Sequence, residues 1–215
     1  MKVHWRVLAI LLSLLSTYGS AFAQTPFYKD FDSKLNGLSG TLIRQEPRTG
    51  APLDALAYGV LYRSTGLKGE PIAVSGAIII SAGQPPPGGR PIVAWAHPTT
   101  GIVPRCAPSL ALFLFQQIQG LREMMRRGYI VAATDYPGLG TPGPHPYLVG
   151  ESEGRAVLDS VRAARALVSA EANNQAAFWG HSQGGQPSPP PRPQPNSVSS
   201  CAPTLRRRAA RTFWQ

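Results

Sequence analysis

Apolar runs of strand length alternate with segments of helical periodicity through the middle of the chain. Strands are predicted at residues 58–63, 72–81, 91–96, 129–134 and 175–179. Helices are predicted at residues 108–127 and 152–169, where apolar side chains recur at helical spacing. Residues 24–54 are mixed in character and rich in turn formers. Apolar strands that alternate with helices are typical of an α/β fold, with a mostly parallel sheet covered by helices on both faces.

Functional residues of such a sheet are expected beyond the carboxyl ends of its strands. Residues 97–101 follow the strand predicted at 91–96, and the residues from Gly180 onward follow the strand predicted at 175–179. These two segments are therefore the strongest candidates for carrying the functional residues. The chain of 215 residues is long enough for one domain with a substantial core.

The first 23 residues have the pattern of a secretory signal peptide. Lys2 and Arg6 give a positive start, Val7–Leu15 is apolar, and Ala21-Phe22-Ala23 matches a cleavage site. The apolar stretch is shorter than the roughly 20 residues that a membrane-spanning helix needs, and no second long apolar run follows. An N-terminal membrane anchor is the alternative. We expect a soluble protein without a stable membrane span, cleaved after Ala23 and secreted or periplasmic.

The net charge of +10 does not indicate a nucleic-acid-binding protein, because the excess lies at the two ends of the chain. Seven basic side chains lie in the leader and after Gly185, where there is no acid: Lys2, Arg6, Arg192, Arg206, Arg207, Arg208 and Arg211. Removing these seven from +10 leaves +3, which is typical of a mildly basic globular surface. The sequence shows no interleaved aromatic and basic platform, so no nucleic-acid partner is expected.

The two cysteines, Cys106 and Cys201, permit a disulfide in an exported protein but do not establish one. Their spacing suits no zinc site, and the sequence contains no Cys-x-x-Cys. We therefore expect no metal centre.

The segment Gly180-His181-Ser182-Gln183-Gly184 fits the pattern G-x-S-x-G, which places a nucleophilic serine at a sharp turn between a strand and a helix. The apolar residues before it predict the strand that such a turn requires. Glycine at positions 180 and 184 removes Cβ atoms that would collide in the strained turn, and Gly185 adds more room. We predict Ser182 as the nucleophile, and a chance glycine-rich turn is the alternative.

Acyl transfer also needs N–H donors for the negatively charged oxygen that forms on the substrate. The backbone N–H of Gln183, directly after the serine, is one candidate. The second donor is expected in residues 97–101, in which Pro98 lacks an N–H. Thr99 is the preferred donor and Thr100 the second choice, while a plain turn is the alternative.

Four ordered motifs resemble the secretory lipase family of α/β-hydrolases, which includes the fungal type-A lipases and many bacterial exported esterases. The motifs are Ala94–Gly101, Cys106–Ser109, Thr134–Gly140 and Gly180–Gly185, and the resemblance runs from about Thr41 to Gly185. It implies an α/β-hydrolase fold, hydrolysis of a carboxylic-ester or lipid substrate, and no metal or organic cofactor. It also implies Ser182 as the nucleophile and the 97–101 loop in the oxyanion hole.

The triad acid and histidine follow the serine in the α/β-hydrolase order, but no His, Asp or Glu follows Ser182 in this sequence. The histidines are His4, His97, His145 and His181. His97 and His145 lie in upstream loops and are candidates either for an unorthodox base or for a structural role. Asp135, at the end of a predicted strand, is either a triad acid or a loop cap. A serine without a base is a poor nucleophile, so we expect the chain to be inactive.

The sequence changes character after Gly185. A proline-rich run and then Arg206-Arg207-Arg208 follow with little apolar pattern, a composition typical of disorder. We expect a signal peptide over residues 1–23, a partial α/β-hydrolase domain, incomplete at its C-terminus, over 24–185, and a disordered Pro/Arg-rich tail over 186–215. A frameshift near codon 186 is one hypothesis for the tail, and a genuine disordered C-terminus is the other.

Three functions stay open at this point. The first is an exported lipase or esterase, the second is a non-catalytic secreted pseudoenzyme or binding scaffold, and the third is a serine peptidase of the same fold. Labelling of Ser182 by a fluorophosphonate separates the first from the second. Preference for esters over peptides separates the first from the third. A domain that is incomplete beside its nucleophile also predicts poor solubility.

Overall fold

The computed structural model describes residues 26–29 and 31–186 of the chain. The predicted signal peptide, residues 1–23, and the tail from residue 187 onward lie outside the described residues. What the sequence predicts for those two segments stays a prediction.

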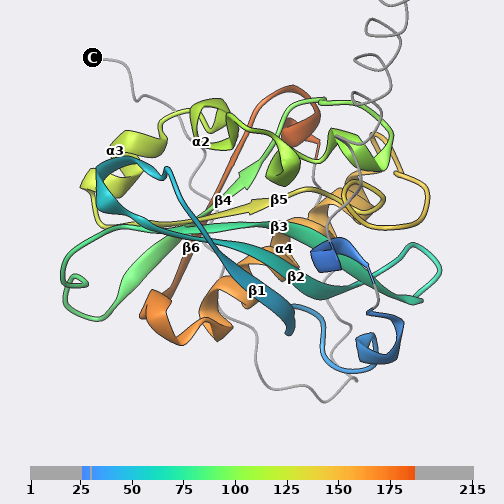
Figure 1. Ribbon diagram of the computed structural model, residues 1–215, viewed down its shortest axis with the longest axis horizontal. Helices are drawn as coiled ribbons and strands as arrows, with labels where there is room; N and C mark the ends of the chain where they lie inside the picture. The colour runs from blue at the N-terminus through green and yellow to red at the C-terminus, as the bar shows by residue number, and fades with distance from the viewer. Residues whose placement is uncertain (1–25, 30, 187–215) are drawn as a thin grey trace, which may run out of the picture.

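A single six-stranded sheet runs through the described residues (Figure 1). Its strands in chain order are β1 (Leu42–Arg48), β2 (Leu56–Thr65), β3 (Pro71–Ile80), β4 (Arg90–Ala96), β5 (Ile130–Thr134) and β6 (Ala172–Gly180). Across the sheet they lie in the order β1-β2-β3-β5-β4-β6. β4 pairs in parallel with β5 and β6, whereas the pairs β1–β2, β2–β3 and β3–β5 are antiparallel.

The sheet is therefore mixed rather than mostly parallel. Only residues 66–70 separate β2 from β3, and a connection this short joins antiparallel strands, because a parallel pair needs a long crossover. All five predicted strands form within a few residues of their expected bounds. β1 was not predicted: it contains Pro47 and charged residues, and it lies at the edge of the sheet, where such residues are tolerated.

Helix α4 (Gly150–Ala166) covers one face of the sheet (Figure 1). Its stripe of Val157, Val161 and Ala164 is buried against apolar strand residues that include Ile78 and Ile130. Burial of aliphatic side chains of this size contributes about 1.5–3 kcal/mol each relative to exposure. The helix predicted at residues 152–169 is thus present, displaced toward the N-terminus by two to three residues.

The opposite face carries two short helices, α2 (Leu114–Gln117) and α3 (Leu121–Arg126). The single helix predicted at residues 108–127 is wrong. Ile118 takes up an extended conformation and Gly120 a left-handed one with φ of 78°, so the helix breaks between the two segments. The helical spacing of Leu114, Ile118, Leu121 and Met125 still places all four side chains in one buried cluster.

Short 3-10 turns complete the described elements. They are η2 (Pro26–Tyr28), η3 (Asp32–Lys34), η4 (Pro52–Asp54), η5 (Pro104–Cys106), η6 (Pro108–Leu110), η7 (Val168–Ala170) and η8 (Ser182–Gly185). No helix within the described part of the chain is long and apolar enough to cross a membrane.

The carboxyl ends of β4, β5 and β6 lie at one edge of the sheet because these three strands run in the same direction. Ala96, the last residue of β4, pairs with Gly180, the last residue of β6. The loop that begins at His97 and the turn that begins at His181 therefore leave the sheet side by side. The two segments that the sequence predicts to carry the chemistry are thus brought together.

Candidate active site

Ser182 lies at the tip of a tight turn between β6 and η8. Its φ of 55° is in the left-handed region, which residues with a side chain rarely adopt. A strained backbone of this kind costs about 1–3 kcal/mol and is found mainly at functional sites. The Ser182 residue is exposed, whereas the next residue, Gln183, is only 2% exposed. This is the geometry of a nucleophile elbow, in which the serine side chain is presented to a substrate.

Glycine is required at two positions of the turn because the backbone packs directly on itself there. A Cβ atom at Gly180 would lie 2.0 Å from the carbonyl oxygen of Gly184. A Cβ atom at Gly184 would lie 1.8 Å from the carbonyl oxygen of Ala96. Both distances are far shorter than any van der Waals contact, so a side chain at either position would push the turn away from β4.

The two predicted oxyanion donors lie on these neighbouring segments. Within the described residues, neither the N–H of Gln183 nor the N–H of Thr99 makes a hydrogen bond. The next N–H in the turn, that of Gly184, donates to the carbonyl of His181 at 2.9 Å and is occupied. Thr99 is exposed, and its hydroxyl lies 3.1 Å from the hydroxyl of Tyr147. Unpaired backbone N–H groups beside an exposed serine are what an oxyanion site requires.

His97 is buried, and its ring contacts backbone carbonyls of neighbouring loops rather than Ser182. Its Nδ1 lies 2.6 Å from the carbonyl oxygen of Pro98, and its Nε2 lies 3.2 Å from the carbonyl oxygen of Asp135. Burial lowers the pKa of the His97 imidazole to about 4, so the ring is neutral at pH 7. The ring also packs on Tyr136, whose hydroxyl donates to the His97 carbonyl at 3.2 Å.

His145 contacts the residue after the serine, not the serine itself. Its Nδ1 lies 2.9 Å from the carbonyl oxygen of Pro137, which can only accept, so Nδ1 carries the proton. Its Nε2 then accepts from the side-chain amide of Gln183 at 3.1 Å. Neither His97 nor His145 forms a hydrogen bond with Ser182, which argues against both as an unorthodox base.

Glu153 is a residue of the site that the sequence analysis missed. It is fully buried, and its Oε1 accepts from the Gln183 side-chain amide at 2.7 Å and from the backbone N–H of Leu148 at 3.1 Å. A signal was present in the sequence. Glu153 is four residues before Val157 and eight before Val161, so it lies on the apolar stripe of α4. An acidic side chain is rarely buried at such a position unless it has a specific partner.

Asp135 caps a loop instead of supporting a histidine. Its carboxylate accepts from the hydroxyl of Ser75 at 2.6 Å and from the hydroxyl of Ser109, and it accepts from the Ser109 N–H at 2.8 Å. Burial raises the pKa of the Asp135 carboxyl above its usual value, and the bonds to Ser109 and Ser75 oppose that rise. No histidine among the described residues forms a hydrogen bond with this carboxylate, which favours the loop-cap alternative.

The described residues contain no cluster of His, Cys, Asp or Glu suited to a metal ion. Cys106 is a free thiol within the described part of the chain, and Cys201 lies outside it. The Ser182 hydroxyl and the N–H groups of Gln183 and Thr99 thus belong to two segments that leave the sheet side by side. Thr100, the second choice for a donor, lies next to Thr99 in the same exposed loop.

Comparisons with known proteins find lipases and esterases that this chain resembles. The sequence model of the Secretory lipase family matches residues 114–190, a stretch that includes α4, β6 and the Ser182 turn. The rice cell wall degrading esterase LipA from Xanthomonas oryzae is 26% identical, with a TM-score of 0.59, over 70% of this chain and 44% of that chain. No curated protein matches the chain.

Two further solved structures share the fold. Candida antarctica lipase A in its closed state is 21% identical, with a TM-score of 0.58, over 78% of this chain and 42% of that chain. A putative hydrolase from Legionella pneumophila is 22% identical, with a TM-score of 0.53, over 64% and 38%. The chain thus spans less than half the length of these structures. The resemblance to secretory lipases and the α/β-hydrolase class of fold, both predicted from the sequence, are confirmed.

Proposed function

We propose that the described residues hold the nucleophile and the oxyanion site of a carboxylic-ester hydrolase of the lipase and esterase type, with Ser182 as the nucleophile. The observation that carries the proposal is the strained, exposed Ser182 at the end of β6 beside the unpaired N–H of Gln183. The similarity to a Xanthomonas esterase and to the Secretory lipase family supports an ester rather than another substrate.

The reaction follows from these groups. The Ser182 Oγ adds to the ester carbonyl carbon while its proton passes to a general base, and the carbonyl oxygen takes up the negative charge. The N–H groups of Gln183 and Thr99 donate to that oxygen, and loss of one such donor costs about 10²–10³ in rate. The alcohol leaves with the proton, and water then hydrolyses the acyl-serine to release the acid and restore the hydroxyl.

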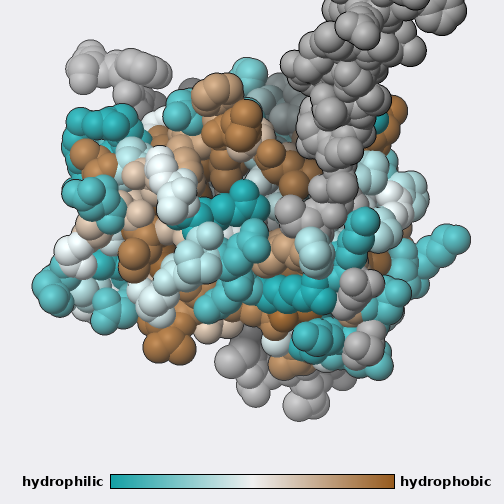
Figure 2. All heavy atoms as spheres, viewed as in Figure 1, coloured by the Kyte–Doolittle hydropathy of each residue, from teal (hydrophilic) through white to brown (hydrophobic). Residues whose placement is uncertain are grey.

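Exposed apolar side chains that follow the 97–101 loop along the chain suit an acyl group. Ile102 directly follows the 97–101 loop and is 64% exposed, and Leu112 and Phe113 lie farther along the same segment, just before α2, with 94% and 66% exposed. Figure 2 shows brown, apolar side chains gathered over the α2 region. Removing such side chains from water favours binding of an apolar acyl chain by about 25 cal/mol per Å².

Within the described residues, neither His97, His145 nor His181 forms a hydrogen bond with Ser182, so no described histidine is placed as the general base. Both nitrogens of His97 and of His145 face other groups. We therefore expect the 215-residue chain to hydrolyse esters slowly, since loss of the catalytic histidine can cost about 10⁶ in turnover. This feature also favours a second candidate function, a non-catalytic secreted binding protein on the same scaffold.

We also propose that the protein is exported, which rests on the predicted signal peptide and on the similarity to the Secretory lipase family. Detection of a mature chain that begins at Gln24, by N-terminal sequencing after expression in a secreting host, tests this proposal.

Chemical rescue tests the proposed activity. Hydrolysis of p-nitrophenyl butyrate is measured with increasing imidazole, which can act as the base from solution. The rate of the protein is expected to rise above that of Ser182→Ala, which shows only the background reaction of imidazole with the ester. Equal rates for the two proteins at every imidazole concentration would leave the binding protein as the better function.

A further inference from the structure

The side-chain amide nitrogen of Gln183 donates two hydrogen bonds, both to residues of the segment 145–153. This Nε2 donates to the Nε2 of His145 at 3.1 Å and to the Oε1 of Glu153 at 2.7 Å. Residue 183 is buried, so these bonds are shielded from water and are stronger than they would be at the surface. Because the backbone N–H of Gln183 is one bond from the Cα that carries this side chain, the two bonds also restrict the direction of that N–H.

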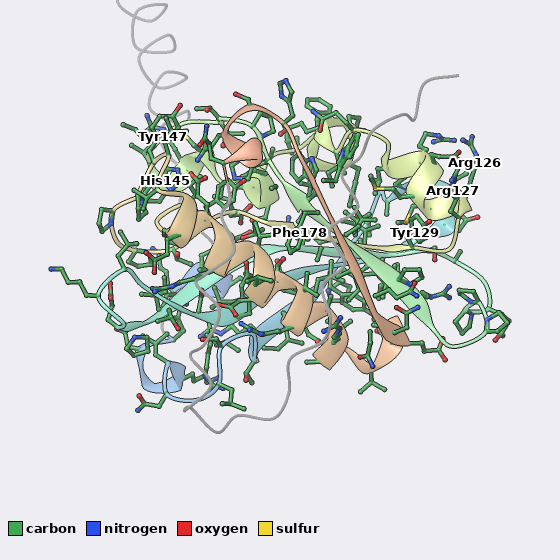
Figure 3. The ribbon with its side chains drawn as sticks, turned by 180° about the vertical axis from the view of Figure 1, so that it is seen from behind. Arg126, Arg127, Tyr129, His145, Tyr147 and Phe178 are labelled. Carbon is green, nitrogen blue, oxygen red and sulfur yellow. The ribbon has the colours of Figure 1, made fainter. Side chains whose placement is uncertain are left out.

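The same segment also reaches the other proposed donor. The hydroxyl of Tyr147 lies 3.1 Å from the hydroxyl of Thr99, at the tip of the 97–101 loop. Figure 3 shows His145 and Tyr147 close together beside the beginning of α4, away from Phe178, Tyr129 and the basic end of α3. Residues 145–153 therefore contact both residues whose N–H groups are the proposed oxyanion donors.

The segment itself is built to be rigid. Leu148 has a φ of 60°, which is costly for a residue with a side chain, and its N–H donates to Glu153 Oε1 at 3.1 Å. The N–H of Tyr147 donates to the carbonyl of His145 at 2.8 Å. One carboxylate oxygen of Glu153 thus ties together the start of α4, the preceding loop and the Ser182 turn.

Glu153 lowers the stability of the fold, which argues that this residue is retained for a functional reason. It is fully buried on the apolar stripe of α4, and its second oxygen has no hydrogen-bond partner within the described residues. A buried carboxylate with an unsatisfied oxygen is destabilising compared with an apolar residue of similar size. A residue that breaks the local pattern in this way is expected at a functional site.

We propose that residues 145–153 form the positioning segment of the oxyanion site, in which Glu153 and His145 orient Gln183 while Tyr147 orients Thr99. This inference rests on the proposed function and deepens it. Glu153, His145 and Tyr147 are positioning residues, because they act through Gln183 and Thr99 and not on the substrate. Displacement of a donor by about 1 Å can cost about 10²-fold in rate.

The test compares Glu153→Ala with Glu153→Gln, which keeps an acceptor oxygen, and with the matched control Glu151→Ala. Glu151 is the other acid in the first turn of α4; it is half-exposed and forms an ion pair with Arg155. Two readouts are used. One is the rate at which a fluorophosphonate labels Ser182, and the other is amide hydrogen exchange, by mass spectrometry, of peptides covering 97–101 and 181–186.

Glu153→Ala is expected to slow labelling by about 10- to 100-fold and to speed exchange in the two peptides, with other peptides unchanged. Glu153→Gln and Glu151→Ala are expected to stay within about 3-fold of the parent chain in labelling. Tyr147→Phe, which removes only an exposed hydroxyl, is the second variant if Glu153→Ala does not fold. It is expected to speed exchange in the 97–101 peptide alone.

The two proposals fail in different ways. Labelling at equal rates in Glu153→Ala and Glu151→Ala would overturn the positioning role while leaving Ser182 as a nucleophile. Absence of labelling in the parent chain even with imidazole present as the base would overturn the proposed function, and the exchange measurement would still decide the positioning role. Exchange that is unchanged in both peptides, or faster throughout the molecule, would overturn the positioning role.

Discussion

Ser182, the proposed nucleophile, has a strained backbone conformation. Its φ of 55° is natural for glycine and costly for serine. The fold tolerates this cost because Gly180 and Gly184 let the turn pack directly against β4. The turn thus exposes Ser182 at a cost in stability, as the proposed role of nucleophile requires.

Ser182→Gly is expected to stabilise the protein by about 1 kcal/mol, because glycine adopts this φ without strain. Ser182→Ala, which keeps a Cβ atom and so keeps the strain, is the control. Thermal unfolding followed by circular dichroism gives the comparison. A melting temperature for Ser182→Gly at or below that of Ser182→Ala would contradict the strained geometry.

His97 gives the folded state a dependence on pH. Burial lowers the pKa of His97 from 6.5 to about 4, so stability is fully present above pH 6.5 and is lost as the pH falls toward 4. The loss between those values is expected to reach about 3 kcal/mol. In His97→Asn the decline in unfolding free energy from pH 7 to pH 4 is expected to be smaller by that amount. Parallel declines in denaturant titrations of the two proteins would show that His97 is not buried in its neutral form.

Among the elements, the turn after β6 depends on its close contact with the end of β4. Gly184→Ala would place a Cβ atom 1.8 Å from the carbonyl oxygen of Ala96 and must displace the turn. Gly185→Ala is the matched control, because a Cβ atom there meets nothing within 4 Å. We expect Gly184→Ala to lower stability by about 1–3 kcal/mol and to abolish Ser182 labelling, and Gly185→Ala to do neither. The same effect in both variants would contradict the close packing.

The elements also show where sequence reasoning succeeds. Short apolar runs such as residues 72–81 predict strands correctly, because the run of apolar residues is itself the signal of a buried strand. The sequence predicts the Ser182 turn because its motif is local and Gly180 and Gly184 each have a steric reason, whereas a Cβ atom at Gly185 would meet nothing. The break at Gly120 could not be predicted, since the apolar spacing continues through it and packing decides the backbone. The bonds of Glu153 to Gln183 were equally out of reach, because they join residues 30 positions apart.

At the scale of the whole molecule, the described part of the sheet ends at β6. β4 pairs with one edge of β6, and the other edge is unpaired within the described residues. Phe178 and Trp179 on this strand are 47% and 38% exposed. An edge strand with exposed aromatic side chains is a template for association between chains, which is the physical basis for the low solubility predicted from the sequence.

Phe178→Lys is expected to raise the soluble fraction of the chain, because a charge on an edge strand opposes pairing with another chain. Val168→Lys is the control for added charge alone, since Val168 is 92% exposed but lies in η7, outside the sheet. The measurement is the concentration that remains soluble after centrifugation at equal total expression. Equal gains in both variants would show that net charge, not the β6 edge, limits solubility.

Whether Ser182 is a nucleophile is decided by locating a fluorophosphonate adduct by peptide mass spectrometry, with imidazole present as the base. We expect an adduct on Ser182 that forms faster than any on Ser169, an exposed serine in η7, and that is absent from Ser182→Ala. Labelling of Ser182 no faster than labelling of Ser169 would show that Ser182 is an ordinary exposed serine and not a nucleophile.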